Sequence, residues 1–290
     1  MNVYNLSNTN LFIHGKISFD LNLPLSVLNN YFIMLTNYVS RLKRNKKYHN
    51  MPLTFIVTGN CGFGFHEESY YHNLIQKHNS FFAENDCYVL FLRGCDDNPV
   101  YFSEEKINYS HIKTIPDYSI VITNNNTTLC VGGGISRDAD WKRDFQAYIH
   151  QFDENKEYTL CMENTQINFD SNILTDIINS NYKINSIITY TAPSCITNKT
   201  NKKNNIWNKT ERVEAYKILE FLQKNNSIIK FWAYGQNNES RNFTQVINDQ
   251  NIHFWSLPTD RSCYFEANAL LDEKDNAFSP DFFMDYIVTA

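Results

Sequence analysis

The sequence has few glycines and no long apolar run. No stretch approaches the roughly 18 consecutive apolar residues that a membrane-spanning helix needs, and residues 1–10 lack the basic segment and apolar core of a secretion signal. We therefore expect a soluble, cytoplasmic protein with no membrane partner. Glycine occurs only 9 times in 290 residues, whereas Asn and Lys are frequent. This bias is typical of an AT-rich genome, so the Asn-rich loops carry little functional information.

Paired cysteines and an excess of positive charge are also missing. The cysteines are odd in number, show no CxxC spacing and lie mostly in apolar runs, which is typical of reduced thiols in a cytoplasmic protein. They are Cys61, Cys87, Cys95, Cys130, Cys161, Cys195 and Cys263. The net charge of −5 gives no overall attraction to nucleic acid, and we expect no nucleic-acid partner. The basic run at residues 41–47 is interpreted as a solvated helix end rather than a nucleic-acid patch.

Short β-rich runs alternate with longer amphipathic runs, which predicts a layered α/β fold in a single domain over residues 1–290. The predicted strands are 11–14, 53–58, 88–92, 187–189 and 228–233, and the predicted helices are 24–47, 67–82 and 210–222. Residues 118–134 predict an antiparallel hairpin around an Asn-rich turn. Runs at 243–247, 252–257 and 262–267 predict a closing meander, and the polar insert 196–205 predicts a loop.

Six stretches, taken in chain order, resemble the loops of calcineurin-like metallophosphoesterases. They are LFIHGKIS (11–18), FIVTGNCGFGF (55–65), LRGCDDNPVYF (92–102), VGGGISRDADW (131–141), SIITYTAPS (186–194) and IKFWAYGQNNES (229–240). The fourth and fifth stretches are similar to motifs of a bacterial branch of that family. In the family, loops at strand ends supply Asp, His and Asn ligands to two metals that activate water and clamp a phosphate. The resemblance implies an α/β/β/α sandwich of two mixed sheets flanked by helices.

The residues that would bind the metals are replaced in this chain. The ligand positions read Lys16, Ser18, Asn60, Cys95, Tyr190, Gln236 and Asn238, and Asp96 stands where the family has its catalytic His. Among the seven ligand positions only Cys95 is a usual transition-metal donor, and Lys16 would place a cation beside the metals at a cost of several kcal/mol. We therefore expect no metal pair, no cofactor and no phosphoesterase catalysis. The resemblance implies a pseudo-phosphoesterase that binds a partner protein or an anionic small ligand.

Lys16, Asn60 and Asp96 are the candidate ligand-binding residues. In one hypothesis Lys16 pairs with Asp96 as a structural polar plug; in the other, Lys16, Asn60 and loop N–H groups bind an anion. The alternative function is an enzyme, either a divergent phosphoesterase that recruits metal through Cys95, Asp96 and Asp97 or a hydrolase that uses different residues. A regulatory subunit of a hetero-oligomer is a third possibility.

The cysteines, histidines and glycines of these stretches have structural and chemical interpretations. Cys61, Cys95 or Cys195 with His14 or His66 would suit a zinc site or a Cys–His nucleophile pair, but unrelated buried thiols are favoured. Arg93 and Asp97, which match the family motif, are expected to support their loop. The run Gly132 to Gly134 is expected to end a strand with unusual backbone angles.

Overall fold

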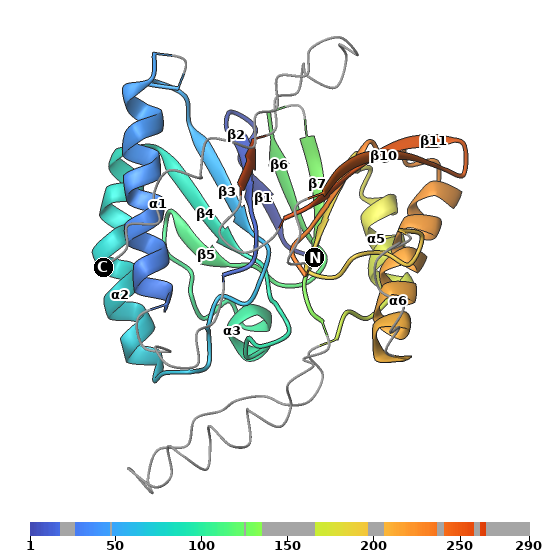
Figure 1. Cartoon of the computed structure of the whole chain (residues 1–290), viewed down its shortest axis with the longest axis horizontal. Coiled ribbons are helices and arrows are strands. Elements are labelled where there is room, and N and C mark those ends of the chain that lie inside the picture. Colours follow the sequence, from blue (N-terminus) through green and yellow to red (C-terminus); the bar gives the residue numbers. More distant parts are fainter. Residues whose placement is uncertain are drawn as a thin grey trace, which may run out of the picture.

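The computed structural model describes residues 1–17, 27–46, 48–124, 126–134, 166–196, 206–236, 241–257 and 262–264 of the chain. These residues form a mixed α/β structure with two β-sheets and helices on either side of them (Figure 1). Within the described ranges, no helix is both long and apolar enough to cross a membrane. The predicted α/β class is confirmed.

The larger sheet has seven strands in the order β1-β6-β7-β8-β9-β11-β10. Their bounds are β1 Val3–Asn5, β6 Ser119–Thr123, β7 Asn126–Val131, β8 Ser186–Thr189, β9 Phe231–Tyr234, β11 Gln250–Ser256 and β10 Arg241–Ile247. The strands from β7 to β11 in this order run parallel, whereas β6–β7 and β10–β11 are antiparallel hairpins. The predicted hairpin at 118–134 is therefore confirmed.

The smaller sheet has five strands in the order β12-β2-β3-β4-β5. Their bounds are β12 Ser262–Tyr264, β2 Asn10–His14, β3 Leu53–Val57, β4 Cys87–Phe91 and β5 Ile112–Thr114. β2 to β5 are parallel, and β12 is antiparallel to β2. Parallel strands are buried on both faces, which explains why β3 reads as the continuous apolar run LTFIV.

Three groups of buried side chains hold the sheets and helices together. The helices are α1 Val27–Arg44, α2 Glu68–Glu84, α3 Val100–Ser103, α5 Ser171–Asn179 and α6 Ile206–Lys224. α1 and α2 pack on the smaller sheet, and α5 and α6 pack on the larger one (Figure 1). A third cluster joins Ile13 and Ile56 of the smaller sheet to Ile188 and Ala233 of the larger one. The inner faces of the two sheets therefore face each other.

The ends of two helices follow from their sequences. α1 has Arg41, Lys43 and Arg44 in its last turn, where cations stabilise the negative end of the helix dipole. α5 begins after Asp170, whose side chain accepts hydrogen bonds from the N–H groups of Asn172 and Ile173. The interpretation of the basic run as a helix end agrees with this placement.

The predicted closing meander is wrong in two places. β11 lies parallel to β9, and β12 crosses to the other sheet and pairs with β2. Sequence runs of similar β propensity do not identify their partners, because pairing is decided by which sheet edge the chain reaches. Strands β1 and β5 and helix α5 were not predicted, since each is short. Residues 197–205 of the predicted loop lie outside the described residues.

Candidate functional site

The candidate site lies where parallel strands of both sheets end. β2, β3 and β4 of the smaller sheet and β7, β8 and β9 of the larger sheet are followed by the six loops that carry the family-like motifs. Several of these loops contact one another across the two sheets. Asn60, Cys95, Asp96 and Tyr190, which are far apart in the sequence, form one contiguous cluster. Ser18 and Asn238 lie outside the described residues.

Asn60 ties the loop after β3 to the loop after β4. Its side-chain Oδ1 accepts hydrogen bonds from the N–H groups of Cys95 at 3.0 Å and Asp96 at 3.3 Å. Its Nδ2 donates to the Asp96 carboxylate at 2.9 Å. The backbone of Asn60 has a φ of 52°, a left-handed conformation that Asn adopts more readily than most residues. Gly94 lies against it, since an added Cβ there would stand 2.1 Å from the Asn60 nitrogen.

The ring of Tyr190 fills the space between loops of the two sheets. A Cβ added to Gly59 would stand 2.7 Å from the Tyr190 ring, and one added to Gly134 would stand 2.6 Å from it. The hydroxyl lies 3.1 Å from the Cys95 thiol, and the residue is only 2% exposed. Burial raises the pKa of Tyr190 well above its ordinary value, so the phenol stays protonated. A neutral aromatic ring therefore occupies the centre of the cluster.

Asp97 organises the glycine-containing loop that follows β3. Its buried carboxylate accepts hydrogen bonds from the N–H groups of Cys61, Gly62, Phe63 and Gly94 at 2.8 to 3.2 Å. Burial raises the pKa of Asp97 to about 6, although the N–H donors act in the opposite direction. The expectation that Asp97 supports its loop agrees with these contacts.

The next three N–H groups of the same loop are also occupied. Those of Gly64, Phe65 and His66 donate to the hydroxyl of Tyr71 at 2.9 to 3.0 Å. The Tyr71 hydroxyl in turn donates to the Gly62 carbonyl at 2.6 Å. Together with the donors to Asp97, this accounts for all six N–H groups of residues 61–66. An anion in this loop would have to displace protein acceptors.

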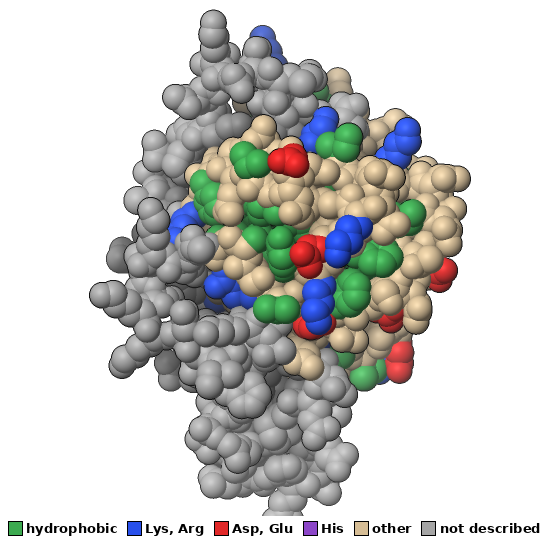
Figure 2. All heavy atoms as spheres, turned by 90° about the vertical axis from the view of Figure 1, so that its right-hand side faces the viewer, with side chains coloured by type: hydrophobic (Ala, Val, Ile, Leu, Met, Phe, Trp, Pro, Cys, Tyr) green, Lys and Arg blue, Asp and Glu red, His purple; other side chains and the backbone are tan. Residues whose placement is uncertain are grey.

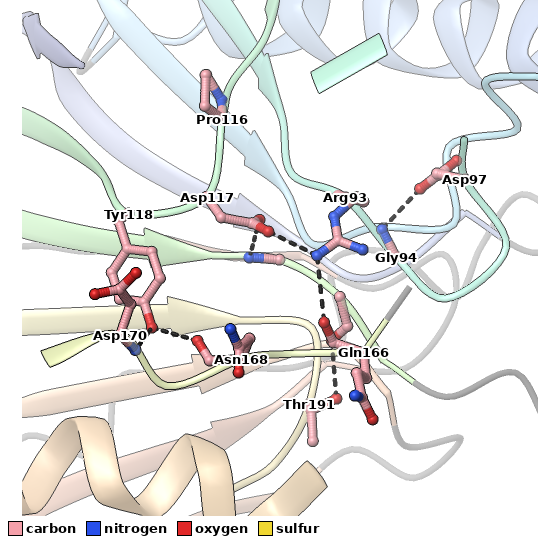
Figure 3. A network of polar contacts seen from close by, with 12 residues as sticks. Arg93, Gly94, Asp97, Pro116, Asp117, Tyr118, Gln166, Asn168, Asp170 and Thr191 are labelled. Atoms are coloured by element: carbon pink, nitrogen blue, oxygen red, sulfur yellow. Dashed lines mark hydrogen bonds and ion pairs between the residues drawn. The ribbon is translucent and has the colours of Figure 1, made fainter. Parts of the chain in front are cut away.

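Arg93 joins the two sheets beside the cluster (Figure 3). Its guanidinium donates to the Asp117 carboxylate at 2.6 Å and lies 3.5 Å from the Gln166 carbonyl oxygen. The other Asp117 oxygen accepts from the Gly132 N–H at 2.8 Å, and the Gly133 N–H donates to the Arg93 carbonyl at 2.7 Å. The φ of Gly133 is 95°, so the expected unusual backbone angle is present at this glycine. Arg93 is thus a structural link between the loops after β4 and β7.

Lys16 and Asp96 make different contacts from the predicted ion pair. The Lys16 ammonium donates to the Gln236 carbonyl at 3.4 Å, whereas the Asp96 carboxylate accepts from Asn60. The Gln236 amide lies 3.4 Å from Glu211, a carboxylate of α6 that is 1% exposed. Glu211 was not predicted, because an acid in an amphipathic helix reads as a surface residue. Its neighbour Thr191 also donates to it at 3.3 Å.

The described side chains do not fit a two-metal centre. Within the described ranges, no group of three or more His, Cys, Asp or Glu side chains is placed to hold a metal ion. Two dications need several anionic or imidazole donors, whereas this cluster presents an amide, a phenol, a thiol and one carboxylate, with the Lys16 ammonium in a neighbouring loop. We derive no chemical step through metals.

The contacts seen for the cysteines favour structural roles over a Cys–His pair. The Cys61 thiol donates to the Leu92 carbonyl, and His14 contacts the Tyr31 hydroxyl at 3.2 Å. Burial and the nearby Asp97 carboxylate raise the pKa of Cys61 well above its ordinary value. Burial likewise raises the pKa of Cys195 to about 12. Neither thiol is a thiolate nucleophile near neutral pH.

Comparisons with known proteins add no functional name. No family model and no curated protein matches the chain. Among solved structures, one crystal structure matches 90% of this chain and 95% of its own, with a TM-score of 0.46 and 10% sequence identity.

Proposed function

We propose that this chain is a catalytically inactive relative of the calcineurin-like metallophosphoesterases that acts by binding a partner protein in the cytoplasm. The proposal includes the α/β/β/α sandwich of that family. Its support is the order of the elements, with α1 and α2 on one sheet, α5 and α6 on the other, and apolar side chains between the sheets. Further support comes from the motif-like stretches, because residues at their key positions meet at one end of the strands.

The observation that carries the proposal is the position of Tyr190. Its ring lies between Gly59 and Gly134, where loops from both sheets converge, and its hydroxyl contacts Cys95. A buried phenol with a raised pKa cannot supply the anionic oxygen that a metal prefers. In the proposed family a ligand His stands at this position, so Tyr190 replaces a metal ligand and its ring fills the space between the loops.

A protein partner is favoured over an anionic ligand at this site. The backbone donors of residues 61–66 are already used by Asp97 and Tyr71. Asp96 adds a negative charge close to Asn60, which disfavours a second anion there. On the described part of the face that Figure 2 shows, basic and acidic side chains lie side by side, so this face lacks the single-sign charge that attracts nucleic acid.

Elemental analysis tests the loss of the metal site. Tag-free protein is purified without chelator, incubated with manganese and zinc, desalted and measured by inductively coupled plasma mass spectrometry. We expect far less than one metal per chain, with the same value for Cys95→Ala and Asp96→Asn. Stoichiometric metal that disappears in these two variants would refute the proposal and support a rebuilt hydrolase site.

Ligand-dependent stability separates the two binding hypotheses. Phosphate, pyrophosphate and a nucleotide are added during thermal unfolding of the wild type and of Lys16→Ala. We expect no ligand-dependent stabilisation in either protein. If a ligand stabilises the wild type but not Lys16→Ala, the site binds an anionic ligand, and the protein-partner hypothesis is refuted. The hypothesis of a protein partner is tested separately. A candidate partner protein is recovered from the source cells and mixed with the purified chain, and a complex of defined stoichiometry is expected.

A further inference from the structure

A second region with ligand-binding features lies at the opposite end of the smaller sheet. A cavity of about 580 Å³ is formed where α1 and α2 end, beside the residues that lead into β3 and β4. The candidate site follows the carboxyl ends of these two strands, whereas this cavity precedes their amino ends. Its volume lies within the range of small-molecule sites, roughly 300 to 1,000 Å³.

The charged lining of the cavity is divided between its two helices. Lys43 and Arg44 come from the last turn of α1, and Glu84 and Asp86 come from the end of α2 and the turn that follows it. These four side chains carry no net formal charge. A neutral lining of this kind does not favour a polyanion such as nucleic acid, although the local sequence at 41–47 is basic.

The opposite charges do not neutralise each other across the cavity. Among the described ion pairs, none involves Arg44, Glu84 or Asp86. The Lys43 ammonium donates to the Met51 carbonyl at 2.7 Å and keeps two further N–H donors. The lining therefore keeps charged groups available, with the cations on the last turn of α1 and the carboxylates at the end of α2 and in the turn after it.

The end of α2 adds to the negative side. The last carbonyls of α2 point out of its carboxyl end, where the helix dipole favours a cation, whereas at the carboxyl end of α1 the cations are Lys43 and Arg44 themselves. Asp86 comes after Asn85, the C-cap residue of α2, and takes a left-handed φ of 51° immediately before β4. On the positive side, the guanidinium of Arg44 offers the planar donor pair that binds a carboxylate.

We propose that this cavity binds a short peptide with free termini, its carboxylate at Lys43 and Arg44 and its ammonium at Glu84 and Asp86. Two separated charges of opposite sign match these two pairs of side chains, and the volume accommodates two or three small residues. In a free amino acid the ammonium and carboxylate groups are attached to the same carbon, so the molecule spans less of the cavity. The site is independent of the Tyr190 cluster, so either proposal can fail without the other.

Isothermal titration calorimetry with trialanine tests the proposal. The full chain is titrated with trialanine, N-acetyl-trialanine and trialanine amide, so that each blocked peptide lacks one terminal charge. We expect the free peptide to bind, and each blocked form to bind roughly tenfold more weakly or worse, because one charged hydrogen-bond partner is lost. Arg44→Gln is expected to weaken trialanine binding by a similar factor.

Arg41→Gln is the matched control, because it removes the same charge from the same helix without changing the cavity lining. Its affinity for trialanine should equal that of the wild type, and circular dichroism should show that both variants are folded. Equal binding of N-acetyl-trialanine would indicate a simple anion site, and equal binding of the amide a simple cation site. Either result would overturn the proposal, as would the absence of binding at millimolar trialanine or equal weakening by Arg41→Gln.

Discussion

His14 provides a quantitative test of how completely water is excluded from the region beside the candidate site. It is the last residue of β2, is 3% exposed, and has aromatic contacts with Tyr31, Tyr38 and Phe55. Burial lowers the pKa of His14 from an ordinary value of 6.5 to about 3. The folded chain therefore holds this imidazole neutral over a pH range in which the unfolded chain binds a proton.

The sign and size of the effect follow from proton linkage. As the pH falls from 6.5 towards 3, the unfolded state gains a proton at His14 that the folded state excludes, so the unfolding free energy falls. Each pH unit within this window corresponds to about 1.4 kcal/mol. Between about pH 7.5 and about pH 5, His14 should therefore remove about 2 kcal/mol of stability.

Urea unfolding of the wild type and of His14→Gln at these two pH values measures the effect. The glutamine cannot titrate, yet it can still accept a hydrogen bond from the Tyr31 hydroxyl. We expect the pH-dependent loss of stability to be about 2 kcal/mol smaller in His14→Gln than in the wild type. His72→Gln changes a partly exposed histidine of α2 and should not produce this difference. An identical pH dependence in the wild type and His14→Gln would show that His14 is reached by water or titrates normally, and would refute this account.

Three further predictions concern the loops of the candidate site and are checked by chemical denaturation. Tyr190→Phe should lower the free energy of unfolding by about 1 kcal/mol, because it loses one hydrogen bond. Tyr190→Ala should lower it by about 3 to 5 kcal/mol, because it opens a cavity. Equal losses in the two variants would contradict the conclusion that the ring fills the space between the loops. Gly94→Ala should cost about 3 kcal/mol or more, since its Cβ would stand 2.1 Å from a backbone nitrogen. Gly62 has a φ of 83°, and no atom lies within 4 Å of an added Cβ, so Gly62→Ala should lower the free energy of unfolding by only about 1 kcal/mol. A larger loss for Gly62→Ala than for Gly94→Ala would contradict the packing described. For Arg93→Met and Asp117→Asn, a double-mutant cycle should give a coupling energy of about 1 to 3 kcal/mol, and a value near zero would contradict the link between the sheets.

Much of the secondary structure could be predicted from apolar periodicity. The amphipathic run at 24–47 predicted a helix, and its apolar residues Leu28, Phe32, Leu35 and Val39, spaced three or four apart, are all buried in α1. Strand pairing was less predictable. β12 is three residues long, and nothing in its sequence distinguishes pairing with β2 from continuing a meander, because a strand's partner is set by distant parts of the chain.

The sequence also predicted which residues would follow the strands, but not what they contact. One of the two hypotheses paired Lys16 with Asp96, whereas the ammonium lies near the carbonyl of Gln236, which follows β9 of the other sheet. Arg93 was expected to support its own loop, and its carboxylate partner Asp117 lies in the segment that connects β5 of the smaller sheet to β6 of the larger one. A loop side chain has many possible partners within reach, so sequence position alone does not select one.

By itself, the sequence determined the alternation of apolar runs that makes an α/β protein, and the residue types present at the positions that match the metal-binding motifs of the proposed family. These are local properties. Strand and helix formation follow from the pattern of neighbouring side chains, and the functional group of a lysine or tyrosine is given by the residue type. Only the tertiary structure decided that Asp97 accepts three N–H donors from residues 34 to 36 positions away, and that the Tyr190 ring fits between two glycines. Such contacts depend on how closely two sheets approach each other, which is settled by packing of the whole chain.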